Sequence, residues 1–278
     1  MISLYDKTTL ECSKLITNRY STSFSLGIST LNKRYHLPIC AIYGFVRLAD
    51  EIVDTFLDHD KETLLNRFEA DTYEAIERKL SLNPVLHAFQ LAVNEFKIDH
   101  ELIAAFLHSM RMDLNLTSCT DDTYDEYIYG SAEVVGLMCL RVFLDGDQQR
   151  YEELKPSGRK LGAAFQKVNF LRDMKSDFQE RGRVYFPGAD FKQFGPDTKA
   201  AIEADIAQDF REAYIGIKQL PDGVRLGVYL AYVYYLALFR KIKSMPPARI
   251  LNERIRVPDV EKAWLLLAVR CKSALRLI

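Results

Sequence analysis

The sequence predicts an all-α fold, and three observations support this prediction. Long stretches repeat apolar residues at the spacing of an amphipathic helix. Alternating apolar and polar runs are scarce, as are the Asn-Gly and Asp-Gly pairs that turn hairpins. Hydrophobic residues make up 48% and charged residues 27% of the 278 residues, which is the balance of a folded globule. We therefore expect a helical bundle with a substantial apolar core.

Clusters of Gly, Pro, Asn, Asp and Ser mark where the helices should end. Between these clusters we expect roughly seven or eight helices. None of the clusters has the length or composition of an interdomain linker, and no solenoid-type repeat is present, so we expect one domain over residues 1–278. The expected breaks are Leu31–Pro38, Ser81–Pro84, Ser118–Asp122, Pro156–Gly158, Arg181–Pro196, Pro221–Gly223 and Ser244–Pro247.

Charge and cysteine content exclude several classes of protein. Lys and Arg (37) nearly cancel Asp and Glu (38), so no basic field is available to bind nucleic acid. The five cysteines include no Cys-x-x-Cys pair, which favours a reducing cytoplasm and argues against a zinc site. The most apolar segment, Gly227–Phe239, is shorter than the roughly 20 residues that span a bilayer. We expect a cytoplasmic protein that makes at most peripheral contact with a membrane.

A first polar stripe interrupts the apolar segment Ile39–Phe56. Tyr43, Arg47, Asp50 and Asp54 follow one another at spacings of four, three and four residues. At about 100° per residue, their side chains fall within roughly 60° on a helix. Taken alone, this stripe has an ordinary explanation, a buried ion pair between Arg47 and an aspartate.

A second stripe of the same kind lies in Gly162–Asp177. Gln166, Asn169, Asp173 and Asp177 are spaced by three, four and four residues. Two such stripes in one chain are harder to attribute to chance than one. Mg²⁺ keeps several waters and binds through one or two carboxylates together with substrate phosphates. The pair of stripes therefore predicts a site that grips diphosphates through Mg²⁺.

The segments around these stripes resemble the squalene and phytoene synthase family. Ser23 and Phe24 precede the first stripe, which reads DEIVD over Asp50–Asp54. YIYGSAEVVG, over Tyr127–Gly136, is similar to the family's Tyr-Cys-Tyr-x-Val-Ala-Gly-x-Val-Gly box. RGRVYFP, over Arg181–Pro187, is similar to the Arg-Gly-Arg-x-Tyr-x-Pro segment of phytoene synthases. The order and spacing of these matches make the resemblance specific, and most similar to the bacterial phytoene synthases.

The matches run from about residue 21 to residue 187, and three positions within them depart from the family pattern. Glu51 stands where the family often has a second Asp, and the aspartate pair around it is intact. Ser131 and Glu133 stand where Val and Gly are usual, which leaves the preferred substrate chain length open. No site is assigned beyond about residue 190.

The resemblance implies an isoprenoid-synthase bundle around a central cavity, with both acidic motifs facing each other across its mouth. The implied catalytic residues are Tyr43, Arg47, Asp50, Asp54, Tyr127, Asp173 and Asp177. The implied substrate-binding residues are Ser23, Phe24, Val135, Gly136, Gln166, Asn169, Arg183 and Tyr185. The implied ligands of Mg²⁺, or of Mn²⁺ in its place, are Asp50, Asp54, Asn169, Asp173 and Asp177.

The residues themselves leave several of these roles open. Arg47 either contacts diphosphate or only orients the aspartates. The rings of Phe24, Tyr43 and Tyr127 suit a carbocation, but ordinary core packing explains them too. The amides of Gln166 and Asn169 are suited to hydrogen-bond substrate phosphate or metal-bound water. The alternative is that both are buried amides whose hydrogen bonds are made within the core.

In function, the resemblance implies head-to-head condensation of two geranylgeranyl diphosphates to phytoene through prephytoene diphosphate, with release of diphosphate, in carotenoid biosynthesis. The nearest alternative is a squalene or dehydrosqualene synthase that uses farnesyl diphosphate. An alternative of another class is a non-catalytic helical scaffold. No Gly-x-Gly-x-x-Gly or Walker sequence is present, so no nucleotide cofactor is expected. The expected partners are prenyl diphosphates, a membrane surface and downstream carotenoid enzymes.

Overall fold

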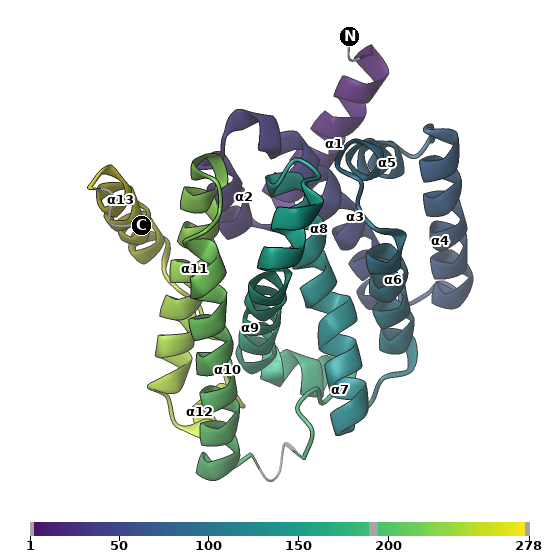
Figure 1. The fold of residues 1–278 in the computed structure, drawn as a ribbon. Coiled ribbons are helices and arrows are strands. Elements are labelled where there is room, and N and C mark those ends of the chain that lie inside the picture. The colour runs from purple at the N-terminus through teal and green to yellow at the C-terminus, as the bar shows by residue number, and fades with distance from the viewer. Residues whose placement is uncertain (1–2, 189–193, 276–278) are drawn as a thin grey trace.

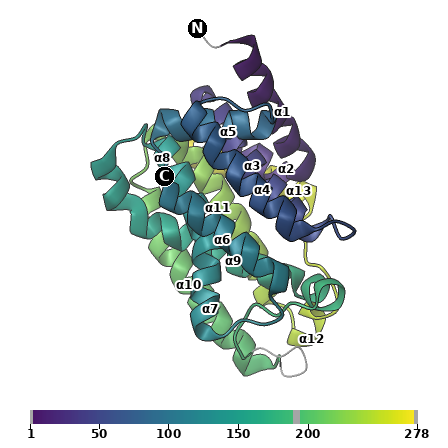
Figure 2. The same cartoon turned by 90° about the vertical axis from the view of Figure 1, so that its right-hand side faces the viewer.

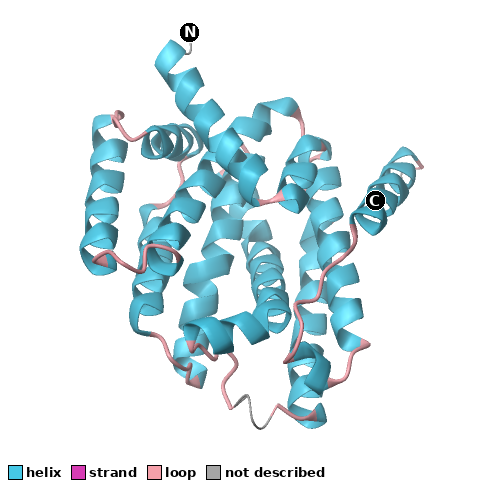
Figure 3. Cartoon of the chain, turned by 180° about the vertical axis from the view of Figure 1, so that it is seen from behind, coloured by secondary structure: helices cyan, strands magenta, loops and turns pink. Residues whose placement is uncertain are grey.

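The computed structural model describes residues 3–188 and 194–275, and within these ranges the chain is helical and contains no strand (Figures 1, 2 and 3). The predicted all-α fold is confirmed. The helices are α1 (Leu4–Tyr20), α2 (Thr22–Ser29), the 3₁₀ turn η1 (Lys33–Tyr35), α3 (His36–Asp54), α4 (Lys61–Arg78), α5 (Pro84–Phe96), α6 (His100–Asn115), α7 (Asp121–Ile128), the π segment η2 (Tyr129–Glu133), α8 (Val134–Phe143), α9 (Gln148–Arg181), α10 (Pro196–Ile217), α11 (Asp222–Lys243), α12 (Pro247–Ile250) and α13 (Asp259–Ala274).

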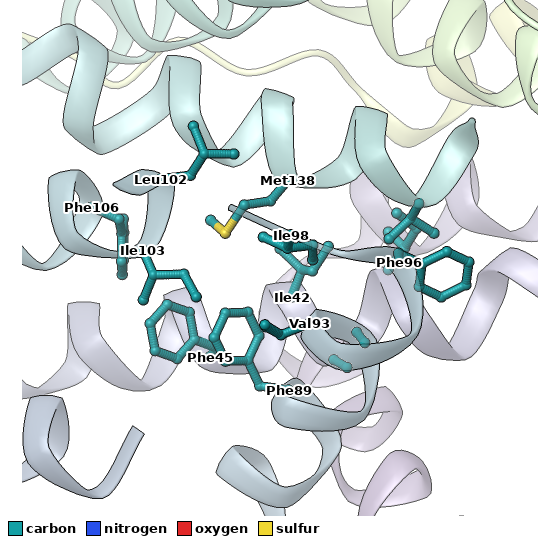
Figure 4. Close-up of a cluster of buried hydrophobic side chains, with 14 of the residues drawn as sticks. Ile42, Phe45, Phe89, Val93, Phe96, Ile98, Leu102, Ile103, Phe106 and Met138 are labelled. Carbon is teal, nitrogen blue, oxygen red and sulfur yellow. The ribbon is translucent and has the colours of Figure 1, made fainter. Parts of the chain in front are cut away.

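Two large apolar cores hold the helices together. The first fills the space between α1, α3, α4, α5, α6 and α8. At its centre the ring of Phe45 on α3 stacks on Phe89 of α5, with centroids 3.9 Å apart, and lies 5.4 Å from the ring of Phe106 on α6 (Figure 4). The second core packs α7 and α9 against α10, α11 and α12. α9 reaches both cores, with Tyr151 and Leu154 in the first and Ala163–Leu171 in the second. Because the second stripe lies on the part of α9 that belongs to the second core, and α3 belongs to the first, the two polar stripes come from different halves of the bundle.

The middle box predicted from the sequence folds as one long helix, α7 to α8, with a π segment inside it. The backbone N–H of Val134 donates to the carbonyl of Tyr129, five residues earlier, which is the π pattern. Single π turns within α-helices are frequent at functional sites. Two glycines let neighbouring helices approach this segment closely. A Cβ on Gly130 would lie 2.5 Å from the carbonyl oxygen of Ala105 in α6, and one on Gly162 of α9 would lie 2.7 Å from that of Ala132.

Gly162→Ala is expected to destabilise the protein by about 1–3 kcal/mol, because the added methyl group meets backbone atoms that cannot rotate away. Gly158→Ala, one turn earlier in α9, is the matched control. Its Cβ would meet only the flexible ends of Leu140 and Leu137, at 3.4 and 3.5 Å. Urea denaturation should show a loss of stability for the first variant and a neutral or slightly positive effect for the second. Equal effects would contradict the close contact of α9 with the π segment.

The predicted break at Pro156–Gly158 is wrong. α9 continues through Pro156, although this residue offers no N–H to the preceding turn. Packing on both sides overrides the local preference: α8 and α10 contact α9, and the hydroxyl of Ser157 donates to the carbonyl of Glu212 in α10 at 3.1 Å. The site helix is therefore longer than its sequence suggests.

The structure also contains more helices than the seven or eight expected, because several helices end without Gly or Pro. Lys79 after α4 and Lys97 after α5 adopt left-handed backbone conformations, with φ of 55° and 53°, at the position where glycine is usual. The other predicted breaks coincide with helix ends, except that α3 begins at His36 and includes Pro38 in its first turn. Residues 189–193 of the predicted break Arg181–Pro196 lie outside the described residues.

Candidate active site

α3 carries the first stripe as four half-buried side chains. The ring of Tyr43 stacks on Phe24 of α2, with centroids 5.0 Å apart. The guanidinium of Arg47 pairs closely with Glu51 and lies 3.9 Å from Asp50 Oδ2. Arg47 is therefore held mainly by Glu51, the residue that departs from the family pattern, and only loosely by the aspartate proposed as its partner.

Asp50 accepts a proton more readily than an ordinary carboxyl. Burial raises its pKa to about 7 against the opposing charge of Arg47, and the nearby carboxylates of Asp54 and Asp113 raise it further. Yet 34% of its side chain is exposed, so solvent still reaches the carboxyl group. Half-buried Tyr43 on the same face also has its pKa raised, to about 12, mainly by burial. A carboxylate in such a position is stabilised by a bound cation.

Without a divalent cation, we expect the free energy of unfolding to fall as the pH rises from about 5 to about 8. The folded chain holds protons at Asp50 and Asp113, with pKa values of about 7 and about 6, that the unfolded chain releases near pH 3.8. In this window the folded state binds more protons than the unfolded state, so stability decreases with pH. Thermal unfolding with chelator should show a smaller decrease for Asp50→Asn, since Asn cannot ionise. Parallel curves for both proteins would contradict the assignment.

α9 carries the second stripe, and its two amides form a short chain toward the π segment. The Nε2 of Gln166 donates to the hydroxyl of Ser131 at 3.3 Å, and the Nδ2 of Asn169 donates to Gln166 Oε1 at 3.5 Å. Ser131 is one of the positions that depart from the family pattern, so this support is a feature of the present chain. The other amide atom, Asn169 Oδ1, is buried and has no hydrogen-bond partner among the described residues.

Asp173, the next residue of this stripe, lies between two arginines. The Nε of Arg172 donates to its Oδ1 at 3.0 Å, and the Nε of Arg254 lies 2.8 Å from the same oxygen. Arg254 belongs to the segment between α12 and α13, is 52% exposed, and lies beyond the part of the chain for which a site was predicted. This cluster carries more positive than negative charge and therefore attracts anions.

Asp113 on α6 is contacted by three side chains of the candidate site, and it was not predicted from the sequence. It is 6% exposed and accepts hydrogen bonds from the hydroxyls of Tyr127, at 2.7 Å, and Tyr185, at 3.4 Å. The guanidinium of Arg183 donates to its backbone carbonyl at 2.9 Å and lies 3.5 Å from its carboxylate. Burial raises the pKa of Asp113 to about 6, while Arg183 and Tyr127 oppose this shift.

Arg183 joins the far ends of the two stripes. Its Nη1 donates to Asp54 Oδ1 at 3.0 Å, and its backbone N–H donates to the carbonyl of Asp177 at 2.8 Å. Burial alone would lower the pKa of this guanidinium, but the charges of Asp113 and Asp54 raise it. Two backbone hydrogen bonds between Val184 and the loop after α6 hold the segment in place. The structure thus connects α3, α6 and α9 at one place.

Comparison with known proteins identifies the family. The family model described as squalene/phytoene synthase matches residues 17–261, which is most of the chain. The chain belongs to the squalene/phytoene synthase family. It is 27% identical to the phytoene synthase of Mycobacterium tuberculosis, over 93% of this chain and 89% of that protein. It is also 27% identical to the 4,4'-diapophytoene synthase of Staphylococcus haemolyticus, over 70% of this chain and 67% of that protein. With this family membership, the chain is a prenyltransferase.

Solved structures confirm the helical isoprenoid-synthase fold of the family. A dehydrosqualene synthase in complex with ligand superposes with a TM-score of 0.82, at 24% identity and with 98% of each chain covered. The squalene synthase HpnC from Alicyclobacillus acidocaldarius superposes with a TM-score of 0.77 at 19% identity, covering 91% of this chain and 98% of that one. The resemblance stated from the sequence motifs is confirmed at the level of family and fold.

The polar groups of this family member fit a divalent ion that arrives with an anionic substrate. In the described part of the chain, no three His, Cys, Asp or Glu side chains are close enough to hold a metal together. The stripes instead supply separate carboxylate pairs, which suits Mg²⁺ because this ion also takes substrate phosphates and water. Of the four buried polar side-chain atoms that lack partners within the described residues, two belong to the stripes, the acceptor Asn169 Oδ1 and the donor Arg47 Nε. A metal–diphosphate complex would satisfy both.

Other predicted residues of this synthase site have structural partners already. Tyr127 and Tyr185 are buried, stacked with centroids 5.1 Å apart, and bonded to Asp113. Gly136 brings α8 against α9, because a Cβ there would lie 3.2 Å from the carbonyl of Gly158. Ser23 and Val135 are half-buried on α2 and α8. Their substrate-binding roles stay predictions.

Two cavities accompany the site. A small one of about 20 Å³ lies beside Asp177, Arg183 and Tyr185 and has room for one water molecule. A groove of about 800 Å³ lies between α3 and α4 and is lined by apolar side chains, such as Leu48 and Ile52, and by charged ones, such as Arg67. These α3 residues lie on the helix face opposite Asp50 and its stripe, so the groove is separate from the candidate site.

Proposed function

We propose that this prenyltransferase condenses two geranylgeranyl diphosphates head to head and releases phytoene. The observation that supports this most is the joining of the α3 and α9 aspartate stripes through Arg183, beside an orphaned acceptor and an orphaned donor. The matched phytoene synthases, which cover most of the chain, support the longer substrate. The overall reaction converts two substrate molecules into one phytoene, two diphosphates and two protons.

In the proposed site, Asp50, Asp54, Asn169, Asp173 and Asp177 would hold Mg²⁺. When bound, the ion would neutralise charge on the departing diphosphate. The remaining groups of the chain bind and orient the substrate.

Arg47 offers its unpartnered Nε to a diphosphate oxygen, and Arg172 with Arg254 lines the approach to Asp173. The stacked rings of Phe24 and Tyr43 present an aromatic surface next to Asp50, which suits the allylic cation that remains after diphosphate leaves. The double bond of the second prenyl chain attacks this cation. Loss of a proton then gives the cyclopropyl diphosphate. Ionisation of this intermediate releases the second diphosphate, and rearrangement followed by loss of a second proton gives phytoene.

A second candidate is synthesis of squalene or dehydrosqualene from farnesyl diphosphate. It is favoured by the solved structures of highest similarity reported above, which are a dehydrosqualene synthase and a squalene synthase. A squalene synthase would additionally need a nicotinamide reductant. Ser131 and Glu133 depart from the family's middle box and leave the preferred chain length open, whereas RGRVYFP, over Arg181–Pro187, favours the phytoene synthases.

The test is incubation of purified protein and Mg²⁺ with each prenyl diphosphate separately, with and without NADPH, followed by chromatography of the hydrocarbon extract. Phytoene from the longer substrate without reductant is the expected product. Squalene or dehydrosqualene from the shorter substrate would replace the proposal by the second candidate. A protein that makes no hydrocarbon from either substrate would overturn both.

A further inference from the structure

α13 presents an apolar stripe to solvent on the side facing away from the bundle. Val260, Trp264, Leu267, Cys271 and Leu275 follow one another at spacings of four, three, four and four. At about 100° per residue, they fall within a sector of roughly 80°. Val260, Trp264, Leu267 and Leu275 are 71%, 67%, 53% and 69% exposed, and all five positions are exposed to solvent. No other described helix shows so continuous an exposed apolar stripe.

The opposite face of α13 already has a partner. α13 lies beside α11 (Figure 1). Val269, which is 2% exposed, and Leu266 pack with Tyr229 and Leu230 of α11, and the ammonium of Lys262 lies 5.8 Å from the ring of Tyr234. α13 is therefore anchored to the bundle by one face while its second apolar face is uncovered. A soluble helix that needs only one core face has no reason to carry a second one.

Charged side chains border the exposed stripe. Lys272 lies on one edge and Arg270 on the other, and both are exposed. Glu261 is the acidic residue at the edge of the helix's first turn. Basic residues beside a Trp- and Leu-containing face are typical of helices that lie in a membrane interface, where Trp prefers the headgroup level and Lys or Arg reaches to anionic lipid.

We infer that α13 is the surface through which this protein docks on an anionic lipid bilayer, with Trp264 inserted at the headgroup level. The stripe spans only a few hundred Å², which is less than the roughly 800 Å² per partner of a stable protein interface. A lipid surface, in contrast, needs only a shallow apolar ridge with basic edges. No helix among the described residues has the length and apolar character to cross a bilayer, so the docking is peripheral.

The exposed stripe is not the most apolar segment of the sequence. Gly227–Phe239, the most apolar segment, lies within α11, whose contacts with α2, α9, α10 and α13 leave it buried or half-buried. The exposed apolar surface is on α13, which covers α11 from outside. The proposed product is a hydrocarbon, which agrees with docking on a lipid surface. The inference itself rests on the exposed stripe.

Trp264 is the only tryptophan of the chain, so its fluorescence reports directly on α13. The substrate-free protein is mixed with vesicles of phosphatidylcholine and phosphatidylglycerol, or of phosphatidylcholine alone. Mixed vesicles should shift the emission to the blue, and lipids brominated on their acyl chains should quench it. High salt should weaken the binding, because screening removes the attraction of Arg270 and Lys272.

Leu267→Ser should lower the vesicle affinity about tenfold, the effect of one apolar side chain that is no longer buried. Leu82→Ser is the matched control, since Leu82 is 91% exposed and lies in the loop between α4 and α5. Equal binding of both variants, or no blue shift of the wild type, would overturn the inference. So would a blue-shifted emission without vesicles in a protein that elutes as a dimer, since a second copy would then cover the stripe. Substrate is absent, so none of these outcomes depends on which hydrocarbon is made.

Discussion

Asp173→Asn is expected to lower turnover by about a hundredfold to a thousandfold, the scale on which loss of one charge-stabilising group acts in a closed site. The substitution keeps the volume of the side chain and removes its charge. Arg172 and Arg254, which now share this carboxylate, would face each other with only a neutral amide between them. The site would therefore lose a proposed metal ligand and gain uncompensated positive charge.

The measurement is hydrocarbon formation from the prenyl diphosphate that the wild type uses, together with thermal unfolding. Saturating Mg²⁺ and inorganic diphosphate should raise the unfolding temperature of the wild type by about 2–4 °C, and that of the variant by less. Asp71→Asn on α4 is the matched control, because Asp71 also pairs with an arginine, Arg67 at 3.7 Å, but lies outside the site. Near-normal product formation by Asp173→Asn would remove Asp173 from the metal site.

The two stripes could be predicted from the sequence because each is local. The spacing of Asp50 and Asp54 on α3, and of Asp173 and Asp177 on α9, repeats with the turn of a helix and needs no knowledge of the tertiary structure. The same period predicted the all-α fold. Helix ends were less predictable, since α9 passes through Pro156 and α4 ends at a left-handed Lys79.

The rest of the site depends on contacts between distant segments. Asp113 is a single acidic residue near the end of an ordinary amphipathic helix. Its place in the site is visible only in the folded structure, where Tyr127, Arg183 and Tyr185 all contact it. Arg254 reaches Asp173 from a segment with no recognisable motif. A burial argument could have pointed to Asp113, because an aspartate among apolar residues of α6 needs a partner. It could not have named that partner.

Asp113→Leu is expected to destabilise the protein by about 3–5 kcal/mol, the usual cost of removing one partner from a buried ion pair. Arg183 would keep only Asp54 as a charged partner among the described residues, and the hydroxyls of Tyr127 and Tyr185 would lose their acceptor. Asp113→Asn keeps an oxygen in place, so its effect on stability should be smaller. The wild type loses stability as the Asp113 carboxyl, with its raised pKa of about 6, ionises, and Asn does not ionise, so Asp113→Asn should compare more favourably with the wild type at about pH 7.5 than at about pH 5.

Urea denaturation at about pH 7.5 and at about pH 5 tests this, with turnover measured on the folded variants. Glu203→Leu on α10 is the matched control, since it removes one partner of the equally buried pair between Lys199 and Glu203, away from the stripes. Both leucine variants should lose stability, but only changes at Asp113 should lower turnover per folded molecule, because Arg183 links Asp113 to Asp54 and Asp177. If Asp113→Asn turns over like the wild type, Asp113 supports the fold alone. A loss of turnover without a loss of fold would make it a positioning residue for both aspartate stripes.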